Sequence, residues 1–209
     1  MARMQSPEDS LFTPTEAAVL TRLPVKAVNN AIDKKIVSSV SGRRAGQATR
    51  LLDVRGLMSL ALERRLADRV TPELRREVFA AAATTPRDRI SLEGGFLTID
   101  LREPRRELAA SLRVLRRARD LVVSDPDILG GAPVFRGTRI PVHQIAAMLA
   151  QGSTAQNLRE AYPRLTAAMI ELAPIYAAAY PQRGRPRAHP WHINPPVRTT
   201  RRKLATLEA

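Results

Sequence analysis

Aromatic side chains are scarce in this chain of 209 residues, where Phe, Tyr and Trp together make up 4%. Hydrophobic residues still account for 44%, so the interior has to be built mainly from Leu, Val, Ile and Ala. Such a core suits several packed helices better than a large β-sandwich, whose strands are usually rich in aromatic side chains. We therefore expect a mainly α fold with small β hairpins.

Several classes of protein are excluded or disfavoured by the composition. The chain contains no Cys, which excludes disulfide scaffolds, Cys-ligated metal centres and thiol catalysis. The first ten residues lack the apolar stretch of a signal peptide. No window approaches the roughly 20 mainly apolar residues of a membrane-spanning helix. We expect a cytoplasmic protein without a membrane partner.

The charge balance points to an acidic partner. Lys and Arg number 34 against 20 Asp and Glu, a formal net charge of +14, and all but four of the basic residues are Arg. An Arg-rich, high-GC genome explains the preference for Arg over Lys about as well as function does. It does not explain the excess of positive charge, which attracts polyanions. Nucleic acid and an acidic protein surface are both candidates.

Two short helices are predicted at the start of residues 11–70. Leu23-Pro24 separates them, because Pro disfavours helix at the preceding residue and suits a helix's first turn. Thr13 or Thr15 is expected to cap the first helix without a reciprocal capping box. The second helix has apolar residues at spacings of three and four, which predict a buried face. These residues are Val25, Val28 and Ile32.

The other face of this second helix carries side chains suited to reading DNA. Asn can bind adenine with two hydrogen bonds, and Lys reaches guanine or phosphate in the major groove. The residues that we expect to contact DNA here are Lys26, Asn29, Asn30 and Lys34.

A hairpin is predicted next, with strands over 36–40 and 49–53 around a turn that carries Arg43 and Arg44. Such a hairpin behind a recognition helix is typical of a winged helix-turn-helix, whose wing contacts the DNA backbone or minor groove. Residues 54–66 predict a third helix that closes the core. The segment resembles the winged-helix modules of MerR-type and excisionase-like proteins. The alternative is an ordinary two-helix corner with a solvated basic loop.

Residues 71–123 are expected to connect this domain to the next. A helix from Thr71 to Ala83, a hairpin with a Gly-Gly turn over 90–101 and an amphipathic helix from Glu103 to Asp120 are predicted. The expected inward residues of the last helix are Leu108, Leu112, Leu115 and Ala118. The expected outward residues are Arg105, Arg106, Arg113, Arg116, Arg117 and Arg119. So many Arg indicate a solvated face that also approaches phosphate or a partner.

The most specific stretch runs from Gly130 to Val142 and reads Gly-Gly-Ala-Pro-Val-Phe-Arg-Gly-Thr-Arg-Ile-Pro-Val. Its first two glycines permit a turn that other residues resist. Val134-Phe135 and Arg139-Ile140 are predicted as short strands around Gly137.

Three helices are predicted to follow, over 142–150, from 153 or 154 to 162, and from 166 to 180. They form a second helix-turn-helix-like unit. The last of them contains no Lys or Arg and is interrupted by Pro174, so it is unsuited to DNA. We expect it to serve as a packing or dimerisation surface.

Residues 125–180 resemble the bacterial domain-of-unknown-function family 433. The family's pattern is Gly-Gly-x-Pro-Val-x-x-Gly-Thr-Arg-Ile-Pro-Val, which falls here on Gly130 to Val142. The resemblance implies a VapB-type antitoxin that binds a cognate PIN-like ribonuclease toxin and represses its own operon. On this basis residues 124–180 are predicted to be the antitoxin-family domain.

Residues 181–209 are predicted to be an extended basic tail that orders on a partner. They contain five Pro, seven basic residues and no acid before Glu208. PIN-type toxins hold a divalent metal with carboxylates, which Arg could pair with and block. Our hypothesis places Arg183, Arg185 and Arg187 in that toxin site, with Trp191 as the apolar anchor. The alternative is a solubilising tail that adds nonspecific affinity for nucleic acid.

Catalysis by this chain finds little support in the sequence. His189 and His192 have a spacing that metals use, but no carboxylate lies near them in the tail. Asp125-Pro126-Asp127 is explained by turn chemistry. We therefore expect no enzyme, no catalytic residue, no metal site and no cofactor.

The expected protein is a homodimeric antitoxin that binds operator DNA and a PIN-like ribonuclease toxin, since operator palindromes match two-fold symmetry. The alternative is a free-standing helix-turn-helix transcriptional regulator without a toxin partner.

Overall fold

The computed structural model describes residues 11–44 and 47–182, and this part of the chain is mainly helical, as predicted. The α-helices are α1 (Pro14–Thr21), α2 (Val25–Asp33), α3 (Val54–Leu66), α4 (Pro72–Thr84), α5 (Arg102–Asp120), α6 (Val142–Ala150), α7 (Ala155–Ala161) and α8 (Ala167–Ala179). The strands pair antiparallel as β1 (Val40–Arg44) with β2 (Gln47–Leu51), β3 (Arg89–Leu92) with β4 (Leu97–Asp100), and β5 (Val122–Val123) with β6 (Val134–Phe135).

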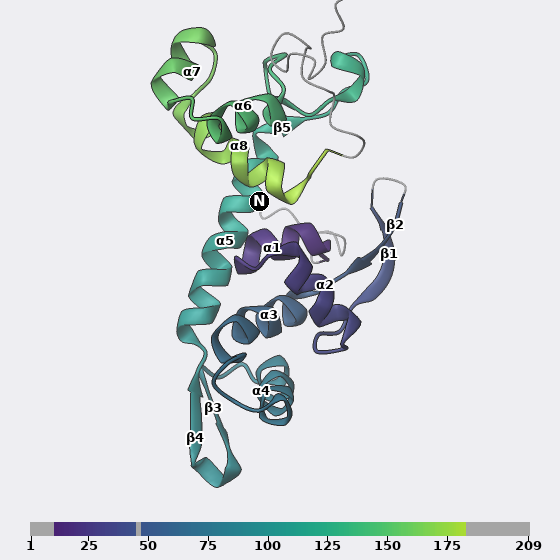
Figure 1. The fold of residues 1–209 in the computed structure, drawn as a ribbon, viewed down its shortest axis with the longest axis vertical. Helices are drawn as coiled ribbons and strands as arrows, with labels where there is room; N and C mark the ends of the chain where they lie inside the picture. Colours follow the sequence, from purple (N-terminus) through teal and green to yellow (C-terminus); the bar gives the residue numbers. More distant parts are fainter. Residues whose placement is uncertain (1–10, 45–46, 183–209) are drawn as a thin grey trace, which may run out of the picture.

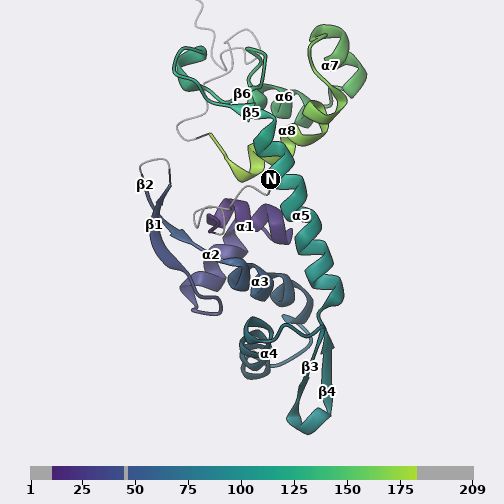
Figure 2. The ribbon, with the colours of Figure 1, turned by 180° about the vertical axis from the view of Figure 1, so that it is seen from behind.

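The long helix α5 runs along one edge of the molecule and connects its two ends (Figure 1). Elements β5 to α8 gather at one end, and the hairpin β3–β4 projects at the other. Helices α1 to α3 lie beside the middle of α5, with the hairpin β1–β2 on the far side from it (Figures 1 and 2). The tip of β3–β4 carries Phe96, whose surface is 91% exposed.

Buried apolar residues form three clusters in the described chain. One joins α1, α2 and α3 to α5 and to the end of α8 through residues such as Val28, Leu60 and Leu115. A second fills the space among β6, α6, α7 and α8 around Phe135, and a third packs α3 and α4 against the base of β3–β4. Leu, Val, Ile and Ala supply most of these side chains, as the scarcity of aromatic residues requires.

The first helix begins with a capping box that the sequence analysis did not expect. The Thr13 side chain accepts a hydrogen bond from the Glu16 backbone N–H, and Glu16 Oε2 accepts one from the Thr13 backbone N–H at 2.7 Å. The reciprocal pair satisfies two donors that the start of a helix otherwise leaves unpaired. The pattern was missed because it was sought from Thr15 rather than from Thr13.

The first strand of the first hairpin begins four residues later than predicted. Strand β1 begins at Val40 instead of residue 36, because the backbone N–H groups of Ile36 and Val37 both donate to the carbonyl of Ala31 and close the end of α2. The return strand is 47–51 rather than 49–53. Arg43 and Arg44 therefore belong to strand β1 and not to the turn.

The partner of β6 also differs from the prediction. Strand β6 pairs with β5, whereas Arg139 and Ile140 form no strand. The backbone N–H of Ile140 donates to the hydroxyl of Thr138 at 3.1 Å, and Pro141 has no N–H to donate. What remains of the predicted pairing is a bond from the Phe135 N–H to the Ile140 carbonyl and a bridge between Val134 and Pro141.

Helix α5 buries the residues predicted for its inner face, with Leu108, Leu115 and Ala118 in the core and Leu112 packed against it. The prediction was wrong for Arg119, which points inward. One of its guanidinium NH₂ groups donates to Glu16 Oε1, and its Nε donates to the hydroxyl of Tyr180. Arg119 follows Leu115 by four residues, which places it on the inner side of α5. There it supplies the cation that the carboxylate of Glu16, 2% exposed, requires.

The contact around Glu16 joins α1, α5 and the end of α8, and we call these three side chains the Glu16–Arg119–Tyr180 contact. The Tyr180 hydroxyl donates to Glu16 Oε1 at 2.5 Å. Burial and the neighbouring carboxylate of Glu16 raise the pKa of Tyr180 above its usual range, so the hydroxyl stays protonated. Burial alone would lower the pKa of Arg119, but its contacts with Tyr180 and Glu16 raise it.

Neighbouring bonds reinforce the same junction. The hydroxyl of Thr15 donates to the carbonyl of Ala179 at 2.8 Å, and Nε2 of His143 lies 2.7 Å from the carbonyl of Tyr180. The end of α8 is thus held against α1 by Thr15 and against α6 by His143.

No helix of residues 11–44 and 47–182 combines the length and the apolar character needed to cross a bilayer. The predicted tail of residues 181–209 lies outside the described residues except for its first two positions.

We predict that Glu16→Ala lowers the free energy of unfolding by about 3 kcal/mol, since it leaves the guanidinium of Arg119 without its carboxylate and removes one half of the capping box. Urea denaturation followed by circular dichroism measures the change. Glu77→Ala is the matched control, because Glu77 is an exposed helical Glu and its loss is expected to cost less than about 0.5 kcal/mol. Equal effects of the two substitutions would contradict the assigned role of Glu16.

Candidate nucleic-acid interface

Helix α2 presents the polar face that the sequence predicted. Val28 and Ile32 are buried, whereas Lys26, Asn30 and Lys34 are exposed. This division follows from apolar residues at spacings of three and four, which the core covers on one side only. Val25, predicted to be inward, is 39% exposed at the first turn.

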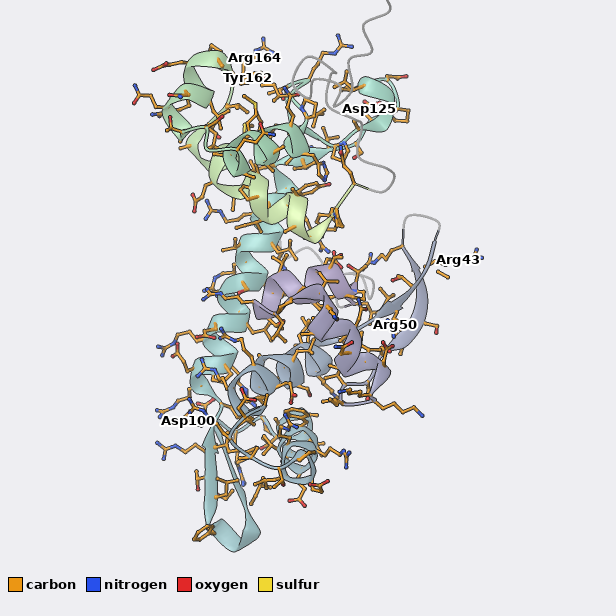
Figure 3. All side chains as sticks on the ribbon, in the orientation of Figure 1. Arg43, Arg50, Asp100, Asp125, Tyr162 and Arg164 are labelled. Carbon is orange, nitrogen blue, oxygen red and sulfur yellow. The ribbon has the colours of Figure 1, made fainter. Side chains whose placement is uncertain are left out.

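Asn29 is held by a residue that the sequence analysis did not single out. Arg50 of β2 donates from one NH₂ group to Oδ1 of Asn29 at 3.1 Å, and its other NH₂ group forms an ion pair with Asp33. Figure 3 shows Arg50 on the hairpin where it faces α2. Arg50 therefore fixes the hairpin against the helix and neutralises the acid on the helix's outer face. The sequence feature that could have indicated this role is the presence of an Arg in the predicted return strand of the hairpin.

The two arginines of β1 behave differently. Arg43 is exposed and points away from the body of the molecule (Figure 3). Arg44 donates from an NH₂ group to the carbonyl of Leu11 at 2.7 Å. Of the two, Arg43 extends into solvent, while Arg44 is engaged with the start of the described chain.

Together these elements form a surface that combines a helix and a hairpin. Its exposed cations include Lys26, Lys34, Lys35 and Arg43, and Asn30 is an exposed amide on the same helix as Lys26. Amides supply both a donor and an acceptor to a base edge, and the cations pair with phosphates on either side. The arrangement can thus bind a polyanion and can read bases through α2.

The last helix of the second predicted unit does not offer a comparable surface. The three helices of that unit are α6, α7 and α8, as predicted, and Thr154 and Thr166 cap the last two. The exposed residues of α8 are Ala167, Glu171, Pro174 and Ala178. Helix α8 packs on α1, α5 and α6, so it is an internal packing element, which is one of the two roles predicted for it.

The signature stretch from Gly130 to Val142 is explained largely by its own folding. Phe135 and Val142 are buried, and the hydroxyl of Thr138, itself 9% exposed, donates to the carbonyl of Phe135 at 2.9 Å. Gly137 has φ +76°, a conformation that residues with a Cβ avoid. The stretch forms a tight loop that positions the start of α6.

Predicted residues of the toxin-binding arm lie outside the described residues. These are Arg183, Arg185, Arg187 and Trp191. Within the described ranges, no group of three or more His, Asp or Glu side chains could hold a metal ion.

Comparisons with known proteins place this chain in a family. The pattern described as "Protein of unknown function (DUF433)" matches residues 122–177, which include the whole signature stretch. The chain is 40% identical over 194 residues to the protein y4eO of Sinorhizobium fredii (strain NBRC 101917 / NGR234), and the match covers 85% of each chain. The chain belongs to the same family as y4eO, and its segment 122–177 matches DUF433.

A solved structure is also similar to this chain at low identity. It is the crystal structure of Rv2018 from Mycobacterium tuberculosis, which is 19% identical and has a TM-score of 0.31. The match covers 82% of this chain and 99% of the other. A TM-score of this size is too low to support a shared fold.

We predict that Gly137→Ala destabilises the fold by about 1–2 kcal/mol, because a Cβ at positive φ is strained. A Cβ there would meet nothing within 4 Å, so steric overlap contributes little and the cost is that of the backbone conformation. Gly137→Asn should be milder, since Asn tolerates this region. Thermal unfolding measures both, and an unchanged midpoint for the Ala variant would contradict the reading.

Proposed function

We propose that this protein is a sequence-specific DNA-binding repressor whose reading surface is helix α2 and whose wing is the hairpin β1–β2. The observation that carries the proposal is the Arg50 bridge, which holds the hairpin beside a helix that exposes Lys26 and Asn30. A helix fixed in this way can enter the major groove while Arg43 contacts the backbone. An ordinary two-helix corner would have no need for a hairpin tied to its second helix.

We further propose that the protein acts as the antitoxin of a type II toxin–antitoxin system. Its partner would be a PIN-like ribonuclease, and the repressed operon would be its own. The support is the resemblance of the signature stretch together with the basic, Trp-containing arm in the sequence. In this proposal Arg183, Arg185 and Arg187 pair with the carboxylates of the toxin site, which would otherwise hold a divalent metal. Operator binding as a homodimer is part of the same proposal.

The reading surface is tested by the combined substitution Lys26→Ala, Asn29→Ala and Asn30→Ala. We expect affinity for the DNA upstream of the protein's own gene to fall at least roughly 100-fold, because each lost base contact is worth about 1–3 kcal/mol. Fluorescence anisotropy with a labelled duplex measures the affinity at fixed salt.

A matched control removes two amides and one cation from an exposed helix elsewhere. Gln156→Ala, Asn157→Ala and Arg159→Ala on α7 meet this need and should leave the affinity almost unchanged. Operator binding that survives the α2 substitutions would show that this surface does not read DNA.

The arm is tested by deleting residues 181–209 and co-expressing the product with the protein encoded next to it. We expect the deletion to abolish toxin neutralisation and co-purification, since it removes the arm's cations and Trp191. Growth of the host and pull-down are the measurements, and operator binding should persist as the internal control. Undiminished neutralisation would remove the arm from the proposal. A neighbouring protein that never binds the full chain would leave a free-standing regulator.

A further inference from the structure

Helix α5 carries a second basic surface that the proposed reading surface does not use. Arg113, Arg116 and Arg117 are exposed and lie at positions i, i+3 and i+4, which places them on one side of the helix. We call these three residues the α5 arginine face. In the chain that the structure describes, none of them forms an ion pair.

The other arginines of α5 are engaged within the molecule. Their partners are Asp100 for Arg102, Asp88 for Arg105, Glu103 for Arg106 and Glu16 for Arg119. Glu107, another acid of α5, accepts from Arg64 and Arg65 of α3 at 2.9 Å each. Asp120 follows Arg116 by four residues and Arg117 by three, and within residues 11–44 and 47–182 it forms an ion pair with neither.

Such an arrangement is unfavourable for the isolated helix. Like charges at i and i+4, as in Arg113 and Arg117, repel one another and weaken a helix. The last turn tolerates cations because they oppose the helix dipole, but Arg113 lies before that turn. An anionic partner that carries several closely spaced charges would relieve this repulsion.

The position of the face indicates which partner fits. Helix α5 and the hairpin β1–β2 lie on opposite edges of the molecule in both views (Figures 1 and 2). A duplex that rests on α2 and the hairpin therefore leaves the α5 arginine face directed away from it. Guanidinium groups match phosphate oxygens, and the face contains no amide that could read a base.

We infer that the α5 arginine face binds the phosphates of a second DNA duplex without sequence preference, so that one molecule bridges two DNA segments. Bridging requires that the proposed function is correct, because α2 and the first hairpin bind the first duplex. Contact with the second duplex depends only on the α5 arginine face. Duplex DNA supplies the regular row of charges that three guanidinium groups on one helix side can neutralise.

The test compares two variants of the full chain that have the same net charge. One carries Arg113→Gln, Arg116→Gln and Arg117→Gln. The control carries Arg76→Gln, Arg139→Gln and Arg159→Gln, which are exposed arginines on α4, the signature loop and α7. Energy transfer between a donor-labelled operator duplex and an acceptor-labelled non-operator duplex reports bridging. We expect the wild-type protein and the control to bridge and the α5 variant to lose the signal.

A second measurement separates this inference from the proposed function. In the background of Lys26→Ala, Asn29→Ala and Asn30→Ala, affinity for a non-operator duplex is measured over a range of salt concentrations. Removing three phosphate contacts should lower the slope of log K against log salt by about 2.7, while the control triple leaves it unchanged.

Each outcome decides the inference. Equal slopes for the α5 variant and the control would overturn it, whether or not the wild-type protein prefers its operator. An α5 variant that binds DNA normally but no longer captures the neighbouring gene's protein would also overturn it, in favour of a protein contact. A lost operator preference with the predicted difference in slope would reject the reading surface and retain the second DNA contact.

Discussion

The buried carboxylate of Glu16 determines how the two parts of this molecule sit together. A charge that is 2% exposed is stable only when a cation and further donors surround it. Here the cation comes from α5, a hydroxyl comes from the end of α8, and a backbone donor comes from the capping box of α1. Because α2 packs directly on α1, the contact around Glu16 also fixes the position of α2, the helix proposed to read DNA.

The packing of α8 is consistent with its low content of charged residues. Its sides pack against α1, α5 and α6, and its exposed positions carry no cation within the described chain. Exposed basic residues occur on several elements, among them α2, the first hairpin and the outer side of α5. Helix α5 and the first hairpin lie on opposite edges of the molecule, and this separation underlies both the proposed reading of an operator and the inferred second DNA contact.

Local patterns predicted the helices well because each rule acts over a few residues. Thr71, Thr154 and Thr166 cap the helices that were expected to start near them, and apolar spacing identified the inner face of α5. The predictions that failed concern residues whose partners lie far away in the sequence. Arg119 follows Leu115 by four residues, so helix periodicity places it on the inner side of α5, although it was predicted to point outward. Its partner Glu16 lies 103 positions away in the chain, and local patterns do not reveal such a partner.

The candidate site shows the same limit. Periodicity placed Lys26 and Asn30 on an exposed face, but it could not show that Asn29 is engaged by Arg50. The shifted start of β1 likewise depends on backbone bonds that close α2, which no strand propensity reveals. The residues of the predicted toxin-binding arm lie outside the described ranges, so their role stays a prediction.

The bonds that tie Thr15 and Glu16 to residues 179 and 180 connect positions 164 apart in the chain. During synthesis the first helices leave the ribosome long before their partners at the end of α8 have been made. The cation of Arg119 is made before the hydroxyl of Tyr180, so the contact around Glu16 can close only after α8 has been synthesised, because pairings of such long range form late. Until then the first helices lack the donor that Tyr180, just beyond α8, supplies.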